Sequence, residues 1–152
     1  MNRLKNLTET KQTIRKAIPS DAAQIASLLG ELGYPATETF VCDRLAYLAP
    51  RTEDSVFVAD FHGEIAGFLS FHILPLFHVE GGLGRITALA VSSRFQRRGI
   101  GKELVSAAES FAWSNGCIRI EVTSGDHRPD AHAFYEAVGY RIDIRRFIKS
   151  RQ

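Results

Sequence analysis

The stretch that decides the fold is residues 89–102, which reads LAVSSRFQRRGIGK. It opens with the end of an apolar run, Arg85–Val91, whose composition is typical of a β-strand. Behind it, apolar residues repeat at helical spacing, namely Leu104, Val105, Ala108, Phe111 and Ala112. The pattern therefore predicts a strand, a turn with two glycines, and a helix over residues 99–115 that Gly116 closes.

The turn itself has the chemistry of an anion site. Gly99 and Gly101 allow the backbone to approach a ligand closely and to adopt conformations that a side chain would forbid. The first turn of the helix presents N–H groups without partners and partial positive charge, which suit a pyrophosphate. Arg97, Arg98 and Lys102 add full positive charges nearby. The spacing alone also fits a basic helix start whose glycines serve only the turn.

Other phosphate and metal motifs are absent from the sequence. No G-x-x-x-x-G-K-[ST] loop occurs, and position 104 is Leu where a dinucleotide fingerprint would place its third glycine. The five histidines show no H-E-x-x-H or similar ligand spacing, so no metal site is expected.

Outward from this stretch, the chain alternates between strand and helix patterns. Before it we expect a strand over Thr13–Ala17, a helix that Ser20 or Asp21 caps and that Gly30, Gly33 and Pro35 end, and a second helix from Thr37 to Pro50. Strands over Ser55–Phe61 and Ile65–Ile73 form a hairpin. After it we expect a strand over Cys117–Thr123, a helix over Asp130–Val138 with Asp130 as its cap, and one or two final strands around Ile142, Ile144, Phe147 and Ile148.

This order, β-α-α-β-β-β-α-β-α-β, predicts an α/β fold, a mixed central β-sheet flanked by helices. The unit of Arg85–Val91, the helix after it and Cys117–Thr123 is a right-handed crossover, so these two strands should be parallel. The chain of 152 residues fits one domain. We expect a frayed N-terminus over residues 1–11 and a single domain over residues 12–152.

Composition sets the class of protein. The apolar and charged fractions are those of a soluble globular chain, and the net charge of +2 is too small to indicate a nucleic-acid partner. No apolar run approaches the length of a membrane span, and the polar N-terminus lacks the apolar stretch of a signal peptide. Cys42 and Cys117 are far apart without a C-x-x-C spacing, so we expect reduced thiols and a cytoplasmic location.

Two segments resemble the GNAT superfamily, the GCN5-related N-acetyltransferases. The pattern Gln96-x-x-Gly99-x-Gly101, after a strand that ends in Leu89-Ala90-Val91, is similar to the acetyl-CoA signature of that superfamily. The segment Ala133–Tyr140, AFYEAVGY, resembles its second signature, F-Y-x-x-x-G-F/Y. Both occur in the expected order with a strand between them, and the resemblance covers nearly the whole chain.

The resemblance implies a GNAT-like fold and a pose for acetyl-CoA as co-substrate. Backbone groups of Leu89, Ala90 and Val91 would pair with the pantetheine arm as an added strand does. Gln96 and the amides of Arg97 to Lys102, a run that includes Arg98, Gly99, Ile100 and Gly101, would hold the pyrophosphate. The two parallel strands would splay apart, and the thioester would enter the gap.

Tyr135 matches the tyrosine with which such enzymes often protonate the leaving thiolate. A phenol with a pKa near 10 is an acceptable proton donor to a thiolate. The alternative is that the ring packs under the cofactor and the hydroxyl is merely hydrogen-bonded.

The chain differs from the GNAT pattern at the residue that would act as general base for the amine. Many relatives carry an acidic residue in the strand that precedes the turn, where this chain has Thr87 and Ala88. Glu80, Glu121 and His127, together with His78, are candidate bases, and each also fits an ordinary surface residue. No base is assigned from the sequence. Arg128 stands where many relatives have asparagine, which alters contacts with the arm of the cofactor.

The expected function is N-acetyl transfer from acetyl-CoA to a primary amine, with a small-molecule amine as partner. The alternatives are a non-catalytic acyl-CoA-binding or sensing module, a protein or peptide N-acetyltransferase, and a partner-binding domain that holds no CoA. The acceptor site is expected from Gly30–Thr39, Leu74–Gly84 and the end of the chain, with Tyr34, Phe40 and Phe77 giving it apolar character. A homodimer is compatible with the sequence, which does not fix the oligomeric state.

Overall fold

The computed structural model of the chain describes residues 12–124, 129–143 and 146–152. They fall into two compact bodies, one that ends at Val122 and one from Thr123 to Gln152. Each body is described by itself. The predicted frayed segment, residues 1–11, lies outside the described residues.

The first body is built on a five-stranded sheet in the order β1-β2-β3-β4-β5. The strands are β1 Thr13–Lys16, β2 Asp54–Phe61, β3 Glu64–Pro75, β4 Gly82–Val91 and β5 Cys117–Val122. Neighbours β1 to β4 pair antiparallel, whereas β4 and β5 pair parallel. The mixed sheet and the parallel pair predicted from the sequence are confirmed, and α3 (Ile100–Ser114) makes the crossover between β4 and β5.

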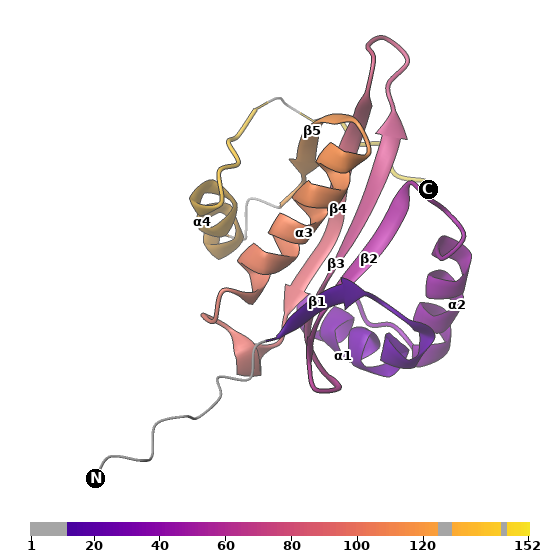
Figure 1. Cartoon of the computed structure of the whole chain (residues 1–152), viewed down its shortest axis with the longest axis vertical. Coiled ribbons are helices and arrows are strands. Elements are labelled where there is room, and N and C mark those ends of the chain that lie inside the picture. The colour runs from indigo at the N-terminus through magenta and orange to yellow at the C-terminus, as the bar shows by residue number, and fades with distance from the viewer. Residues whose placement is uncertain (1–11, 125–128, 144–145) are drawn as a thin grey trace. The chain divides into compact units, whose positions relative to one another are not determined.

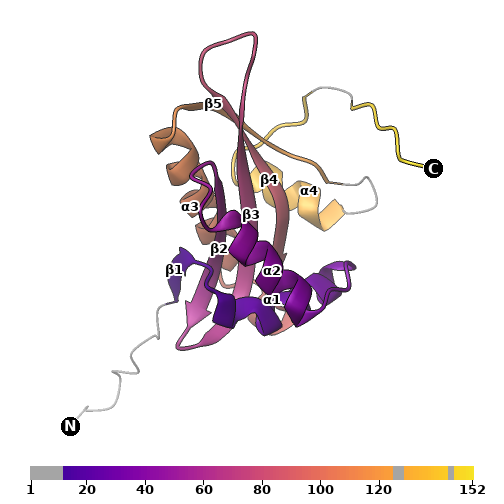
Figure 2. The ribbon, with the colours of Figure 1, turned by 90° about the vertical axis from the view of Figure 1, so that its right-hand side faces the viewer.

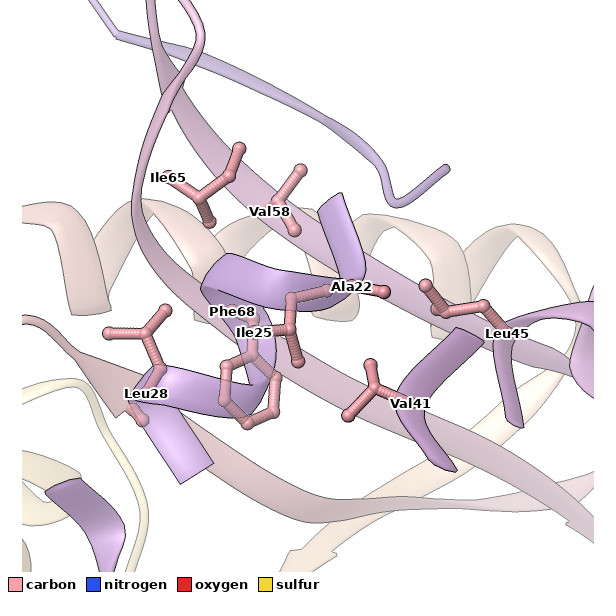
Figure 3. Packing of buried hydrophobic residues seen from close by; sticks show 9 residues of the cluster. Ala22, Ile25, Leu28, Val41, Leu45, Val58, Ile65 and Phe68 are labelled. Carbon is pink, nitrogen blue, oxygen red and sulfur yellow. The ribbon is translucent and has the colours of Figure 1, made fainter. Parts of the chain in front are cut away.

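Helices cover both faces of this sheet. In Figures 1 and 2, α3 lies across one face, and α1 (Ala22–Leu32) and α2 (Glu38–Leu48) lie on the other. Figure 3 shows that Ile25 and Leu28 of α1 and Val41 and Leu45 of α2 point toward the sheet residues Val58, Ile65 and Phe68. All of these side chains are buried, so the apolar stripes read from the sequence become one core.

The start of α3 is held tightly against the sheet at Gly67 of β3. A Cβ at this position would lie 2.8 Å from the carbonyl oxygen of Ala90 and 3.2 Å from Cδ1 of Leu104. Ile100 and Leu104 are essentially inaccessible to solvent, with 1% and 0% exposure. Only glycine allows this approach, which fixes the first turn of α3 next to the end of β4.

Asp21, one of the two residues predicted to cap α1, is its N-cap residue, but its side chain does not cap the helix. The helix follows a short 3-10 turn, η1 (Pro19–Asp21), and Asp21 makes no side-chain cap hydrogen bond to it. The buried carboxylate of Asp21 instead accepts hydrogen bonds from Arg15 at 2.8 and 2.9 Å and from the N–H of Ile18 at 2.8 Å. The salt bridge to β1 therefore takes the place of a cap. For α2 the predicted cap is confirmed, since Oγ1 of Thr37 accepts from the N–H of Phe40.

In the second body the helix is confirmed and the strands are not. The helix α4 runs over Pro129–Ala137, so Asp130 lies in its first turn instead of capping it. Gly139 has a positive φ of 97°, as expected just after a helix. Described residues 140–143 and 146–152 form no strand, and Ile144 lies outside the described part. Ile142, Phe147 and Ile148 are largely exposed, because no described strand offers them a partner.

Candidate functional site

The two parallel strands pair over only half of β4. Their register runs from Gly82↔Cys117 to Ile86↔Val122, and residues Thr87–Val91 of β4 have no partner in β5. On its other edge β4 stays paired with β3 as far as Gly67↔Val91. The backbone groups of the last five residues are therefore available on one edge, which an extended ligand can pair with as an added strand does. Leu89, Ala90 and Val91 all lie on this stretch.

A β-bulge lies where the pairing with β5 ends. Ser70 of β3 pairs with Ala88 and Phe71 pairs with Ile86, so Thr87 is an extra residue without a partner opposite it. A bulge bends its strand and increases the local twist. The bulge follows directly after Ile86, which makes the last pair with β5 through Val122.

The turn that follows β4 is anchored to the rest of the body. The N–H of Ser92 donates to the carbonyl of Ala66 at 2.8 Å, and the N–H of Ser93 donates to Oε2 of Glu31 at 3.1 Å. A 3-10 turn, η2 (Ser93–Phe95), buries the ring of Phe95. The turn therefore presents Gln96–Gly99 to solvent from a fixed base.

The N-terminus of α3 is open. Gly99 precedes the helix with φ 76°, and no side chain of the described residues caps it. At this end, the N–H of Glu103 donates to the carbonyl of Gly99 at 3.1 Å. Arg97 also has a positive φ, 64°, which is uncommon for a residue other than glycine. Two left-handed residues so close together, before free helix N–H groups, make a concave arrangement of the kind that binds anions.

Positive side chains surround this open end. Arg94 is paired with Glu64 at 2.7 Å. Arg98 lies over the ring of Phe95, 5.2 Å from its centroid. Arg97 and Lys102 are exposed and form no ion pair with another described residue. The predicted cations Arg97, Arg98 and Lys102 thus form no ion pair with another described residue, and their role toward a phosphate stays a prediction.

Tyr135 lies on α4 in the second body. It is half-buried, and its ring makes edge-on contacts with Phe134 and Tyr140 at centroid distances of 5.2 and 5.9 Å. Its carbonyl accepts from the N–H of Tyr140 at 2.9 Å. These contacts hold the ring in place within the body, and the role of the hydroxyl stays a prediction.

The candidate bases differ in their surroundings. Glu121 is engaged by Arg85 at 2.9 Å and by Arg119 at 3.1 Å. Glu80 and His78 are exposed in the connection between β3 and β4. His127 and Arg128 lie outside the described residues.

A polar network that sequence reasoning missed surrounds His72 of β3. Its Nδ1 lies 2.7 Å from Oδ1 of Asp54, and its Nε2 lies 3.0 Å from Oγ1 of Thr87 and 3.1 Å from Oγ of Ser70. Asp54 is buried at the start of β2 and is also bound by Arg51. The available signal was weak: Ser70 and His72 are two polar residues at strand spacing in an otherwise apolar run, and their partners are far away in sequence.

The charge state of Asp54 follows from these contacts. Burial alone favours the neutral carboxyl group, but the hydrogen bonds from Arg51 and His72 outweigh it and hold the pKa of Asp54 below its ordinary value. Asp54 is therefore an ionised acceptor next to the imidazole at neutral pH.

Three further observations bear on the predictions. The aromatic residues proposed for the acceptor site, Tyr34, Phe40 and Phe77, are all more than half exposed, at 65%, 51% and 106%. Cys42 and Cys117 are free thiols, and burial raises the pKa of Cys117. Over the described ranges, no three His, Cys, Asp or Glu side chains group closely enough to hold a metal ion, and no helix is long and apolar enough to cross a membrane.

Comparison with known proteins identifies relatives. Residues 25–140 match the family model described as the acetyltransferase (GNAT) family. The chain is 33% identical over 89 residues to the aminoalkylphosphonate N-acetyltransferase of Salmonella typhimurium, a match that covers 59% of this chain and 58% of that protein. It is 30% identical over 141 residues to the uncharacterized N-acetyltransferase YhfO of Bacillus subtilis, which covers 86% of this chain and 90% of that protein.

The fold is also similar to that of solved structures, among them a complex with CoA. The aminoglycoside N-acetyltransferase AAC(6')-Iy in complex with CoA superposes with a TM-score of 0.79 over 93% of this chain and 94% of that one, at 18% identity. At this identity the likeness establishes the fold.

Proposed function

The chain belongs to the acetyltransferase (GNAT) family, and from this premise we propose that it transfers the acetyl group of acetyl-CoA directly to a primary amine of a small molecule. The family match and relatives named N-acetyltransferases support acetyl-CoA-dependent acetyltransferase activity. Small amines are favoured as acceptors because the Salmonella relative is named for an aminoalkylphosphonate and the CoA-bound neighbour for an aminoglycoside.

The observation that carries the proposal is an unpaired strand edge followed closely along the chain by an open helix start. Residues Thr87–Val91 leave one edge of β4 without a partner, and Gly99 leaves the first turn of α3 without a side-chain cap. The pantetheine arm would pair along Leu89–Val91. The pyrophosphate would accept from amides between Arg97 and Lys102, with Gln96 at the entrance of the turn.

The chemistry asks little of the protein beyond positioning and proton transfer. The amine nitrogen forms a bond to the thioester carbon, and the carbon–sulfur bond breaks. Holding the two reactants in line is worth several kcal/mol of the barrier. The leaving thiolate needs a proton, which we assign to the hydroxyl of Tyr135.

The role of Tyr135 is tested by Tyr135→Phe, which keeps the ring and removes the hydroxyl that would donate the proton. General acid catalysis is worth about 10²- to 10⁴-fold in rate, roughly 3 to 5 kcal/mol of barrier. We expect kcat to fall by about that factor while the affinity for acetyl-CoA is little changed. A loss confined to KM would mean that Tyr135 only helps to hold the cofactor, and full activity would refute the assignment.

The proposed function as a whole is tested by measuring free-thiol release from acetyl-CoA with a panel of amines. The panel includes aminoalkylphosphonates, aminoglycosides, polyamines, amino acids and a peptide with a free N-terminus. We expect release that depends on one of the small amines. Release with the peptide alone would identify a peptide N-acetyltransferase, and tight CoA binding without release would identify a sensing module.

A further inference from the structure

The network around His72 joins three strands at the point where β4 leaves β5. Asp54 comes from β2, His72 from β3 and Thr87 from the bulge of β4. The geometry points to a proton relay, and we propose that His72, oriented by Asp54, accepts the proton that the acceptor amine must lose, through the hydroxyl of Thr87. This inference rests on the proposed acetyl transfer and supplies the base that the sequence does not assign.

Asp54 fixes which nitrogen of His72 carries the proton. The carboxylate can only accept, so Nδ1 of His72, 2.7 Å away, donates to it. In the neutral imidazole, Nε2 is then the nitrogen without a proton, and it can accept one. The carboxylate is buried, with its side chain 6% exposed, and it also balances the charge that the imidazole gains when it is protonated. Asp54 is thus a positioning residue.

Thr87 connects this nitrogen to the open edge of β4. Its Oγ1 lies 3.0 Å from Nε2 of His72, closer than the 3.4 Å to the carbonyl of Ser70, and the residue is exposed. It is the first residue of β4 beyond the last pair with β5. An amine that attacks a thioester held along Thr87–Val91 therefore approaches next to this hydroxyl. Ser70 offers Nε2 a second hydroxyl at 3.1 Å, from the paired strand β3.

The relay accounts for both protons that the ammonium group loses. The ammonium form of the acceptor gives one proton to Oγ1 of Thr87 as the proton of that hydroxyl passes to Nε2 of His72. The neutral amine then attacks, and its second proton replaces the one that the thiolate takes up on leaving. His72 finally releases its proton to solvent, so one amide, one thiol and one free proton result.

Other charged groups around His72 are already paired. Arg85 of β4 lies opposite His72 in the β3–β4 register and is bound to Glu121 of β5 at 2.9 Å. Arg51, before β2, binds Asp54 and Glu53. Within the first body, therefore, the carboxylates near His72 other than Asp54 are held by arginines, and the imidazole is the group that we assign as proton acceptor.

The test compares His72→Asn with His62→Asn. Asparagine at position 72 retains an N–H for Asp54 and lacks the accepting nitrogen, while His62 is an exposed turn residue with φ 50° that asparagine tolerates. We expect kcat/KM of the first variant to fall about 10²- to 10⁴-fold at neutral pH. The deficit in kcat/KM should shrink as the pH rises toward the pKa of the amine. The affinity of His72→Asn for acetyl-CoA should equal that of the wild type. The His62→Asn variant should have the kcat/KM of the wild type.

A second pair tests the relay. Thr87→Ser retains the hydroxyl and should retain most of the activity, whereas Thr87→Val removes it at constant shape and should fall as far as His72→Asn. Equal activity of the valine and serine variants would overturn the relay. Wild-type rates in His72→Asn at neutral pH would overturn the role of His72 while leaving the acetyl transfer intact.

A third measurement needs no substrate. Nitrogen chemical shifts of the histidine side chains report the tautomer of His72 directly. We expect the proton on Nδ1 and a free lone pair on Nε2 in the wild type, and loss of this preference in Asp54→Asn. A proton on Nε2 in the wild type would overturn the proposal. If the wild type releases no thiol with any amine, the proposed function fails, and the role of His72 in it fails too.

Discussion

The starts of α2 and α3 solve the same problem in opposite ways. At α2, Oγ1 of Thr37 accepts from the N–H of Phe40, so the chain satisfies its own helix end. At α3, Gly99 has no side chain, and no described residue replaces it as a cap. A helix start costs stability when its N–H groups lack partners. We therefore propose that the open start of α3 serves a ligand, whereas the capped start of α2 serves the fold.

The comparison predicts that substitutions at α3 affect binding. The largest effect is expected for Gly101→Asp, because a carboxylate would occupy the place of the pyrophosphate and repel it. We expect the affinity for CoA to fall by about 100-fold, close to 2.7 kcal/mol. Calorimetric titration of folded protein measures it, and unchanged affinity would mean that the pyrophosphate binds elsewhere.

The start of α1 offers a third case, in which an ion pair replaces the cap. Asp21→Asn leaves Arg15 without its main partner, and we expect a loss of about 2 to 3 kcal/mol of unfolding free energy, measured by urea denaturation. CoA affinity should stay the same. A loss of affinity without a loss of stability would contradict this division of roles.

The pH dependence of stability follows from the same residue. Although burial opposes ionisation, hydrogen bonds from Arg15 and Ile18 hold the pKa of Asp21 below its ordinary value of 3.8. A carboxylate with a depressed pKa stabilises the fold above about pH 4 and loses this contribution as the pH falls through its folded-state pKa. The asparagine variant should therefore show a shallower loss of stability below pH 4. Asp54 and Asp60 also have lowered pKa values, so part of the acid limb should remain.

The variant Arg97→Gly distinguishes a role of Arg97 in CoA binding from the backbone strain at the open start of α3. Arg97 holds a left-handed backbone with φ 64°, which glycine adopts without steric cost. We expect CoA affinity to fall about 10-fold from the lost charge, with a shallower dependence on salt, while stability is not lowered. Thermal unfolding measures the stability of the variant, and CoA titrations at two salt concentrations measure its affinity and the salt dependence of that affinity. A destabilised variant with full affinity would show that Arg97 serves the fold.

The smallest effect is expected at the capped start. Thr37→Ala removes the acceptor for the N–H of Phe40 and should cost about 1 kcal/mol of stability. The affinity for CoA should match the wild type. A variant that binds CoA more weakly would remove the contrast between the two helix starts.

Most of the correct predictions came from sequence patterns that extend over a few neighbouring residues. The strand, the glycine turn and the helix over residues 85–115 were readable because each rests on spacing within a few residues. The side-chain contact of the N-cap residue Asp21 was not readable because its carboxylate binds Arg15 on a different element. His72 was missed for the same reason, since Asp54 and Thr87 are 18 and 15 residues away. The described residues 140–143 and 146–152 form none of the predicted final strands, because apolar residues alone do not supply a partner strand.

The most direct test of the account is amide hydrogen exchange of the wild-type protein with and without CoA. We predict slower exchange in two segments, the unpaired edge Thr87–Val91 and the open turn Arg97–Lys102, because ligand groups take up their N–H bonds or cover them. The first turn of α2 should exchange at the same rate in both states. Unchanged exchange at Arg97–Lys102 in protein saturated with CoA would contradict the claim that the open helix start holds the pyrophosphate.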